Sequence, residues 1–440
     1  MSFSKLKYEP SYDFCEEILS EIFKRLPVKH VLRCGAVQKS WYSLIKTPMF
    51  ISLHSNHQKL TADINPKYLL FNDTITNLYT VRSDDSQCRK YCTFHYPFEL
   101  PEKSWYGQAN GLFCVSTMFN QELGYKTDIY LWNPLVSKFR SIPSSPLPRY
   151  RYREIRWNAL AFGFLPEVDD YVVVHVVKPS STAEPHSPDA DYYAIRPYDT
   201  PPYARYLHSV KIGVYSLNTN SWKEICQDNV FVDEMCVNES EFVNGTAFWI
   251  GYNNDLSEQV VMYFDTKTNL LGQISVPIWV VRHTRQLENP VILPFGQSIA
   301  YFVEGDVDDW DDDDEEEDDF GTSHLDIWVL NDKKRVLIDE SIHEDFWENR
   351  LMSRDDAWEN KMSVKLGENV WAEVLGTRNN GAPIQAKSNN LISYDLDTHE
   401  PYDFIESCDR FTPFYYLKED SQSPFLIRPF VETLALLDID

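Results

Sequence analysis

The chain has 440 residues, with 67 acidic and 41 basic side chains and a formal net charge of −26. This length allows a small module beside one large hydrophobic core. Eight cysteines are an ordinary number for a chain of this length, so a reducing compartment is expected. Residues 1–10 lack the apolar stretch of a signal peptide, and the longest apolar run, at 171–177, is too short for a membrane helix. We therefore expect a cytoplasmic or nuclear protein that is neither secreted nor inserted in a membrane.

A helical module is predicted over residues 14–58, after a tail at 1–13. Asp13 can cap a first helix with Glu16 three positions later, and apolar residues then recur at helical spacing. Pro27 ends this helix because proline has no amide hydrogen and restricts the residue before it.

Two further helical segments are predicted after this proline. Val37 begins an apolar face that includes Trp41 at an offset of four. Thr47 is placed as a cap and Pro48 as the first residue of a third, short turn. About forty residues of short helices cannot easily bury two apolar faces alone. We therefore expect part of this surface to dock on the second domain or on a partner.

The module resembles an F-box. The match lies in LPVK at 26–29, VQKSW at 37–41 and LIKTPMF at 44–50, in the family's order and spacing, although Gly35 and Ala36 stand where larger residues are usual. A generic helical hairpin is the alternative. The resemblance implies binding of a Skp-type adaptor, with some of the predicted contact residues instead holding the helices together: Leu19, Ile22, Leu26, Pro27, Val31, Leu32, Val37, Trp41 and Leu44.

The remainder, residues 59–440, is predicted to be all β. Four segments share one pattern, in which an aromatic residue and a turn rich in Asn, Asp and Thr precede a second strand; the aromatics are Trp132, Tyr215, Phe264 and Tyr394. Repeating units of this kind indicate stacked or radial sheets such as a propeller. An irregular β-sandwich is the alternative. The fold class is therefore a two-domain α+β protein with a small helical module and a large, propeller-like β domain.

This second part resembles the plant F-box-associated domain, sometimes described as kelch-like. NGLFCV at 110–115 resembles the opening of that domain, and seven further segments follow in the family's order, up to FVETLALL at 430–437. Two insertions depart from the family: a proline-rich loop at 179–202 and about 25 residues before Trp358. Such long loops usually carry recognition.

Two charged segments are candidates for binding the target. Residues 304–319 carry thirteen carboxylates and no basic residue, so we expect an extended, solvated loop that attracts a basic partner or is a tolerated insertion. The candidate positions within it are Asp311, Asp312, Asp313, Asp314 and Glu315. The opposite charge occurs in Arg149, Arg151 and Arg153, which alternate with tyrosines and are expected to contact an acidic substrate or the chain's own acidic loop. Nucleic acid is disfavoured as a ligand because the acidic chain repels phosphate.

Catalytic and metal-binding patterns are not found. Cys88, Cys92 and His95 lie close in sequence, but no second ligand pair follows at zinc-finger spacing. His175, in a run of valines, is expected to be a strand residue. We therefore predict a non-enzymatic protein without a metal or cofactor.

The two resemblances together imply a substrate receptor of an SCF-type ubiquitin ligase. In that family the F-box binds the Skp-type adaptor, which joins a cullin and a RING subunit, and the second domain binds the protein to be ubiquitinated. The sequence is also similar to the S-locus type, which adds self-incompatibility and a basic protein target as open options. Two other functions stay open: a non-degradative interaction scaffold and a glycan-binding F-box protein.

Overall fold

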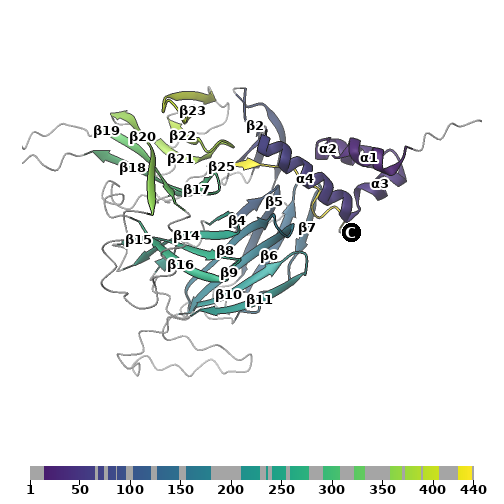
Figure 1. Cartoon of the computed structure of the whole chain (residues 1–440), viewed down its shortest axis with the longest axis horizontal. Coiled ribbons are helices and arrows are strands. Elements are labelled where there is room, and N and C mark those ends of the chain that lie inside the picture. The colour runs from purple at the N-terminus through teal and green to yellow at the C-terminus, as the bar shows by residue number, and fades with distance from the viewer. Residues whose placement is uncertain are drawn as a thin grey trace, which may run out of the picture.

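The structure is a computed structural model. It describes residues 14–64, 68–73, 78–85, 87–95, 103–119, 126–147, 155–179, 210–227, 234–235, 240–253, 258–276, 291–307, 322–331, 357–368, 372–387, 390–405 and 425–438. Four helices come first, and the remaining described elements are strands (Figure 1). The helices gather at one side of the strands, with α1 to α3 farthest from them.

The helices are α1 (Glu16–Phe23), α2 (Val28–Gly35), α3 (Lys39–Ile45) and α4 (Pro48–Ile64). The first helix starts after Cys15, which makes no side-chain capping bond, and the predicted cap Asp13 lies outside the described residues. Thr47 caps as predicted, because the Phe50 amide donates to its Oγ1 at 3.2 Å. The prediction of a short turn after Pro48 is wrong: α4 is 17 residues long. None of the helices among the described residues is long and apolar enough to cross a membrane.

The described strands fall into four-stranded groups, which we call blades 1 to 6, each given from its inner to its outer strand. Blade 1 contains β4 (Lys103–Ala109), β5 (Leu112–Phe119), β6 (Lys126–Asn133) and β7 (Lys138–Ser141). Blade 2 contains β8 (Ile155–Leu165), β9 (Asp170–Pro179), β10 (Val210–Ser216) and β11 (Ser221–Gln227). Blade 3 has a divided inner strand, β12 (Glu234–Met235) and β13 (Glu241–Val243), followed by β14 (Thr246–Asn253), β15 (Glu258–Asp265) and β16 (Leu270–Ser275).

The second half of the domain repeats this order. Blade 4 contains β17 (Val291–Phe295), β18 (Ser298–Val307), β19 (Thr322–Leu330) and β20 (Trp358–Glu368). Blade 5 contains β21 (Ala372–Thr377), β22 (Pro383–Lys387), β23 (Asn390–Tyr394) and β24 (Pro401–Ile405). Blade 6 joins the two ends of the chain: β25 (Phe425–Phe430) is followed by β1 (Tyr68–Asp73), β2 (Leu78–Ser83) and β3 (Lys90–His95).

The blades form a closed ring. Each inner strand contacts the next from β4 through β8, β13, β17 and β21 to β25. Blades 5 and 6 meet in a parallel contact between Gly376 and Ile427. The ring closes from blade 6 to blade 1, where Gln108 Nε2 donates to the Pro429 carbonyl at 2.7 Å. The part of the chain described here is therefore a six-bladed propeller, in which the C-terminal strand supplies the inner strand of a blade made by N-terminal strands.

The predicted hairpins are the outer strand pairs of four blades. Their marker aromatics Trp132, Tyr215, Phe264 and Tyr394 are all buried, and so fill the core. The turns also follow the expected chemistry: Asp265 Oδ1, for example, accepts bonds from the backbone amides of residues 267 and 268 at 2.7 and 3.2 Å.

Two predicted boundaries differ from the ends of the elements in the structure, and a third coincides with the end of a strand. The helical module was expected to end at residue 58, but α4 continues to Ile64. The acidic loop was expected to begin at residue 304, but β18 continues to Val307, which pairs with Thr322. The proline-rich loop begins at Pro179, the last residue of β9, and the rest of both loops lies outside the described residues.

Each blade has two ends. The β4–β5 turn lies against the C-terminal tail, since a Cβ on Gly111 would meet the Val431 carbonyl oxygen. The β8–β9 turn contacts α4, since Ser52 Oγ donates to Asp169 Oδ2 at 2.7 Å. We call this the helix-side end and the opposite one the far end. Because strands within a blade alternate in direction, the connections in the middle of each blade and between blades lie at the far end.

Candidate functional site

The helical module has its own core. Phe23 and Trp41 meet edge to face with ring centroids 5.3 Å apart, and Phe23 meets Phe50 in the same way at 6.5 Å. Three of the residues predicted to contact the adaptor are buried in this core, namely Leu19, Val31 and Leu44. In this structure they hold the helices together, a role that the sequence assigned to part of the set.

The other predicted contact residues are more accessible. Ile22 is 48% exposed and Val37 is 73% exposed, whereas Leu26, Pro27, Leu32 and Trp41 are half-buried. Five further exposed apolar side chains of the helical module were not among the predicted contact residues, because helical spacing does not show which face of a short amphipathic helix is covered: Phe14, Ile18, Tyr42, Met49 and Leu60.

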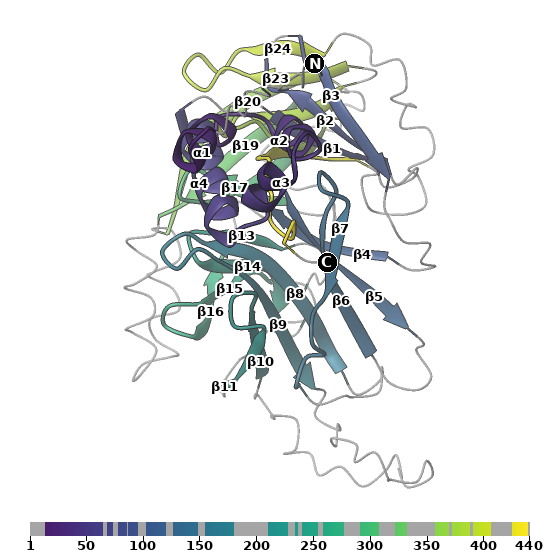
Figure 2. The ribbon, with the colours of Figure 1, turned by 90° about the vertical axis from the view of Figure 1, so that its right-hand side faces the viewer.

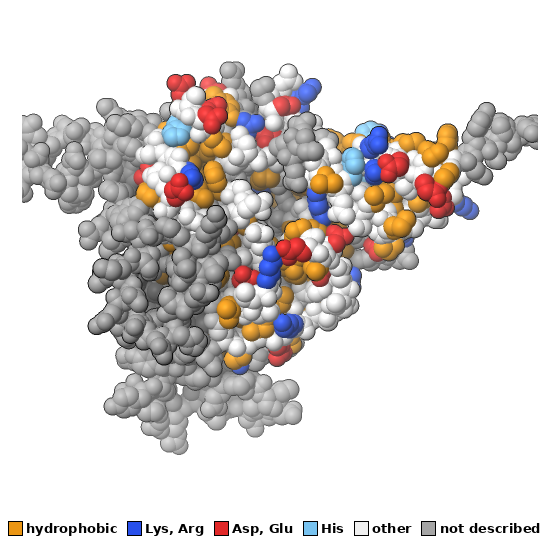
Figure 3. Space-filling model, in the orientation of Figure 1, with side chains coloured by type: hydrophobic (Ala, Val, Ile, Leu, Met, Phe, Trp, Pro, Cys, Tyr) orange, Lys and Arg blue, Asp and Glu red, His pale blue; other side chains and the backbone are white. Residues whose placement is uncertain are grey.

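Exposed apolar side chains concentrate on the helices. Of eleven large hydrophobic residues exposed in the described part of the chain, seven lie in residues 14–64. The space-filling view shows hydrophobic side chains spread over this module (Figure 3). Exposed apolar side chains that concentrate on one module are typical of protein interaction sites.

A groove runs along α1, lined by Glu17, Ile18, Glu21, Ile22, Arg25 and Leu26. Ile18 and Ile22 are spaced four residues apart, so they lie side by side on one face. The Glu21 carboxylate lies 2.6 Å from Lys24 Nζ, and the Lys24 hydrogen bond holds the pKa of Glu21 below its ordinary value. The groove is therefore an apolar strip with a charged rim, the usual composition of an interface.

Helix α4 clamps the connection between α1 and α2. His54 Nε2 donates to the Leu26 carbonyl at 2.9 Å, and Gln58 Nε2 donates to the same carbonyl at 3.3 Å. Burial lowers the pKa of His54 to about 4, so the ring is neutral near pH 7 and its Nε2 carries the hydrogen. These bonds fix the shape of the segment that carries LPVK.

The same helix holds the module on the propeller. Lys59 Nζ lies 3.7 Å from Asp169 Oδ1 and 3.4 Å from the centroid of the Phe164 ring. Burial lowers the pKa of Lys59 to about 8, against the opposing attraction of Asp169. Figure 2, in which this side of the molecule faces the viewer, shows the helices in front of the strands.

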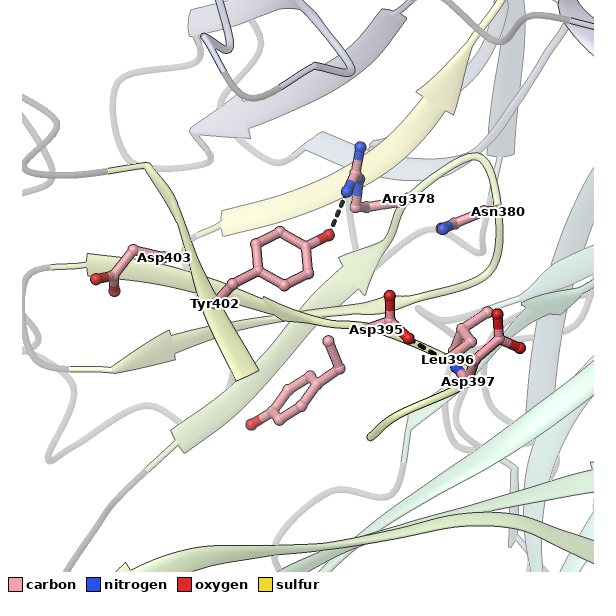
Figure 4. A pocket seen from close by; sticks show the side chains of 8 residues that line it. Arg378, Asn380, Asp395, Leu396, Asp397, Tyr402 and Asp403 are labelled. Atoms are coloured by element: carbon pink, nitrogen blue, oxygen red, sulfur yellow. Dashed lines mark hydrogen bonds between the residues drawn. The ribbon is translucent and has the colours of Figure 1, made fainter. Parts of the chain in front are cut away.

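The propeller has a polar hollow of about 520 Å³ at the helix-side end of blade 5 (Figure 4). Arg378 is part of its lining, but the guanidinium is already engaged in hydrogen bonds within the protein: Nε donates to Asp84 Oδ1 at 2.6 Å and Nη1 donates to the Tyr402 hydroxyl. Two tyrosine rings and three carboxylates make up much of the remaining wall: Tyr394, Tyr402, Asp395, Asp397 and Asp403. Their charge favours a cationic side chain over an anionic one.

Two family models match the chain. The model described as "F-box associated beta propeller domain" matches residues 68–342, and the model described as "F-box domain" matches residues 12–53. The chain belongs to the F-box-associated beta propeller family of F-box proteins. The F-box match covers α1 to α3 and the first turns of α4, so the exposed apolar groove lies on the F-box.

Relatives of this F-box protein include plant proteins. It is 22% identical over 268 residues to "Putative F-box protein At3g16210" of Arabidopsis thaliana, covering 60% of this chain and 61% of the relative. It is 26% identical over 211 residues to "F-box protein CPR1" of the same plant, covering 48% and 44%. The chain thus spans less than two thirds of the length of these relatives.

Solved structures that resemble it include the beta-propeller domain of the Trilobed protease from Pyrococcus furiosus. This match has 12% identity and a TM-score of 0.32, and covers 68% of this chain and 71% of the other. This likeness is too weak to inform on the fold or the function of the chain.

The residues predicted to bind the target lie outside the described part of this F-box protein. These are Arg149, Arg151 and Arg153, between blades 1 and 2, and residues 311–315, between β18 and β19. Both segments connect strand ends at the far end of the propeller. The 180–209 segment, between β9 and β10, connects strands at the same end.

The described residues supply no metal site. Among them, no three His, Cys, Asp or Glu side chains come together in a way that could hold a metal ion. Cys88 and Cys92 belong to two different hydrophobic clusters, so the sequence trio is not a ligand set. His175 bonds through Nδ1 to Ser145 Oγ at 2.8 Å and through Nε2 to Asn158 Oδ1 at 2.7 Å, which makes it a satisfied core residue.

Proposed function

We propose that this F-box protein is the substrate-recognition subunit of an SCF-type ubiquitin ligase. The observation that carries this proposal is the exposed apolar groove on α1, an F-box helix that lies away from the strands of the propeller (Figure 1). The F-box binds a Skp-type adaptor, through which a cullin and a RING subunit join the complex. The propeller binds the protein to be ubiquitinated.

The chain then acts by proximity. A target lysine held near the charged conjugating enzyme reacts at a raised effective concentration, and this requires no catalytic side chain in the receptor. A rigid connection between the two binding domains suits this role, because a fixed span keeps the target within reach. The bonds of Ser52 and Lys59 to Asp169 support such a connection.

The far end of the propeller is the proposed target-binding surface. At the helix-side end, blades 1, 2 and 6 are in contact with α4 or the tail. Two long connections, between Val307 and Thr322 and between Pro179 and Val210, belong to the far end, whereas the long connection between Leu330 and Trp358 belongs to the helix-side end. Long connections on a rigid scaffold are the usual carriers of specificity.

Adaptor binding is tested with substitutions on the surface of α1. Ile18→Asp and Ile22→Asp place a charge in the groove without touching the core of the module. We expect each to weaken binding of a purified Skp-type adaptor at least about tenfold, because interface anchors commonly contribute more than 1 kcal/mol. The matched control is Leu270→Asp, an equally exposed aliphatic residue on the propeller at 49%. Equal binding by all three variants would refute the assignment.

Target binding is tested by affinity capture in plant cells with the cullin inhibited. The intact chain is compared with a variant that lacks residues 308–319, a segment that lies between the paired residues Val307 and Thr322. We expect the deletion to remove basic proteins from the captured set and to leave the adaptor in it. The same captured set, at low and at high salt, would remove the acidic loop from target recognition. A captured partner whose half-life ignores both loss of this chain and cullin inhibition would instead support a scaffold.

A further inference from the structure

The C-terminal tail, residues 431–438, is part of the F-box core. Leu434 and Leu437 are buried at 0% and 6% exposure, and they belong to the same hydrophobic cluster as Phe23, Val31 and Ile45. Leu434 and Leu437 therefore complete a core whose buried helical members lie between Leu19 and Phe50. Figures 1 and 2 show the tail passing between the helices and the strands of blade 1.

The tail has two faces because it forms a turn. The Leu437 amide donates to the Leu434 carbonyl at 3.0 Å, which brings these two leucines together at the ends of a four-residue turn. Leu436 has a φ of 70°, a left-handed conformation that is unfavourable for a branched side chain. Ala435 and Leu436 belong to the cluster of blades 1 and 2. One turn thus presents two leucines to the F-box and two residues to the propeller.

Hydrogen bonds on both sides fix the tail. Asn133, in blade 1, donates from Nδ2 to the carbonyls of Thr433 at 3.0 Å and Ala435 at 2.8 Å. From the helical side, Ser55 Oγ lies 3.2 Å from Thr433 Oγ1. The tail directly continues β25, the strand that completes blade 6 and closes the ring. Its position is therefore set by ring closure.

We propose that the tail makes the folded state of the F-box depend on closure of the propeller. A helical module of this size is marginal without added core. Leu434 and Leu437 supply that core when β25 is in place, so a chain with an open or truncated propeller has a loosened F-box. In terms of the proposed function, on which the adaptor part of this inference rests, such a chain does not recruit the ligase. Only a receptor with a complete target-binding domain is then presented to the adaptor.

The experiment uses the full chain with the double substitution Leu434→Ala and Leu437→Ala, beside Leu436→Ala as the control on the propeller face of the same turn. Hydrogen exchange is followed separately in 14–64 and in blades 3 and 4. We expect the double variant to exchange at least about tenfold faster in 14–64, with blades 3 and 4 unchanged, because each buried leucine contributes strongly to its core. The Leu436→Ala variant should leave 14–64 protected.

The inference is overturned if 14–64 keeps its protection in the double variant, or if it loses protection only together with blades 3 and 4. Adaptor affinity gives a second reading: we expect a loss of about tenfold or more in the double variant and none in Leu436→Ala. Because the exchange measurement needs no adaptor, it separates the two proposals. Loosened helices in a chain that never bound the adaptor would support the tail inference and contradict the ligase function.

Discussion

An ion pair joins opposite sides of the propeller and allows a sharp test of ring closure. Arg428 Nη1, on β25 of blade 6, donates to Glu241 Oε1, on β13 of blade 3. The two side chains are 16% and 7% exposed. Burial raises the pKa of Glu241, and the attraction of Arg428 only partly opposes this. The attraction between the two side chains is therefore smaller than the free energy lost when the carboxylate is removed from water.

From this balance we predict unequal effects of substituting the two partners. Glu241→Leu removes the carboxylate that accepts from a guanidinium that cannot lose its proton, and should lower the free energy of unfolding by about 2 kcal/mol. Arg428→Leu should cost less, and less at pH 5 than at pH 8, because the Glu241 carboxyl can take up a proton. The double substitution to leucine should be near neutral.

The assay is chemical denaturation followed by tryptophan fluorescence, arranged as a double-mutant cycle. The cycle isolates the coupling between the two side chains from their separate packing. A Glu241→Leu variant within about 1 kcal/mol of the wild type, or a double variant as unstable as the sum of the single variants, would refute a buried pair that spans the ring.

Three other predictions concern the fold and its junctions. Gly376→Ala should lower the free energy of unfolding by at least about 3 kcal/mol in the same denaturation assay, because the new Cβ would lie 1.7 Å from the Ile427 carbonyl oxygen. A variant as stable as the wild type would contradict the contact between blades 5 and 6. The free energy of unfolding should fall as the pH is lowered from about 6.5 to 4, because His54 and His175 each have a pKa of about 4 in the folded chain and are protonated at higher pH in the unfolded chain. Each histidine should account for a loss of up to about 3 kcal/mol, and a flat profile over this range would contradict their burial. Asn133→Ala should cost about 2–4 kcal/mol and raise proteolysis of the tail, because two buried carbonyls lose their donor; an unchanged cleavage rate would show that this side chain does not hold the tail.

Much of the fold could be predicted from local sequence patterns. The hairpins at Trp132, Tyr215, Phe264 and Tyr394 are formed as expected, because turn chemistry and strand alternation act over a few neighbouring residues. The Thr47 cap and Pro48 start are confirmed for the same reason. The length of α4 was missed because polar residues such as Asn56 and Gln58 interrupt its apolar pattern. In the structure Asn56 bonds to Ser52 one turn earlier on the same helix, and Gln58 bonds to the Lys24 carbonyl.

What could not be predicted depends on distant contacts. The pairing of β25 with β1, and hence the number of blades, joins residues more than 350 positions apart. The sequence also could not show which face of α1 is covered: Leu19 and Ile22 have the same helical spacing and chemistry, yet the first is buried and the second is exposed. The contribution of Leu434 and Leu437 to the F-box was missed because the tail resembled the end of the β domain alone.

We claim that the F-box groove on α1 recruits a Skp-type adaptor, and calorimetric titration of the full chain with the purified adaptor measures this binding. We predict saturable binding by the wild type, at least about tenfold weaker binding by Ile22→Asp, and unchanged binding by Leu270→Asp. No binding by the wild type, or equal binding by Ile22→Asp, would contradict the claim.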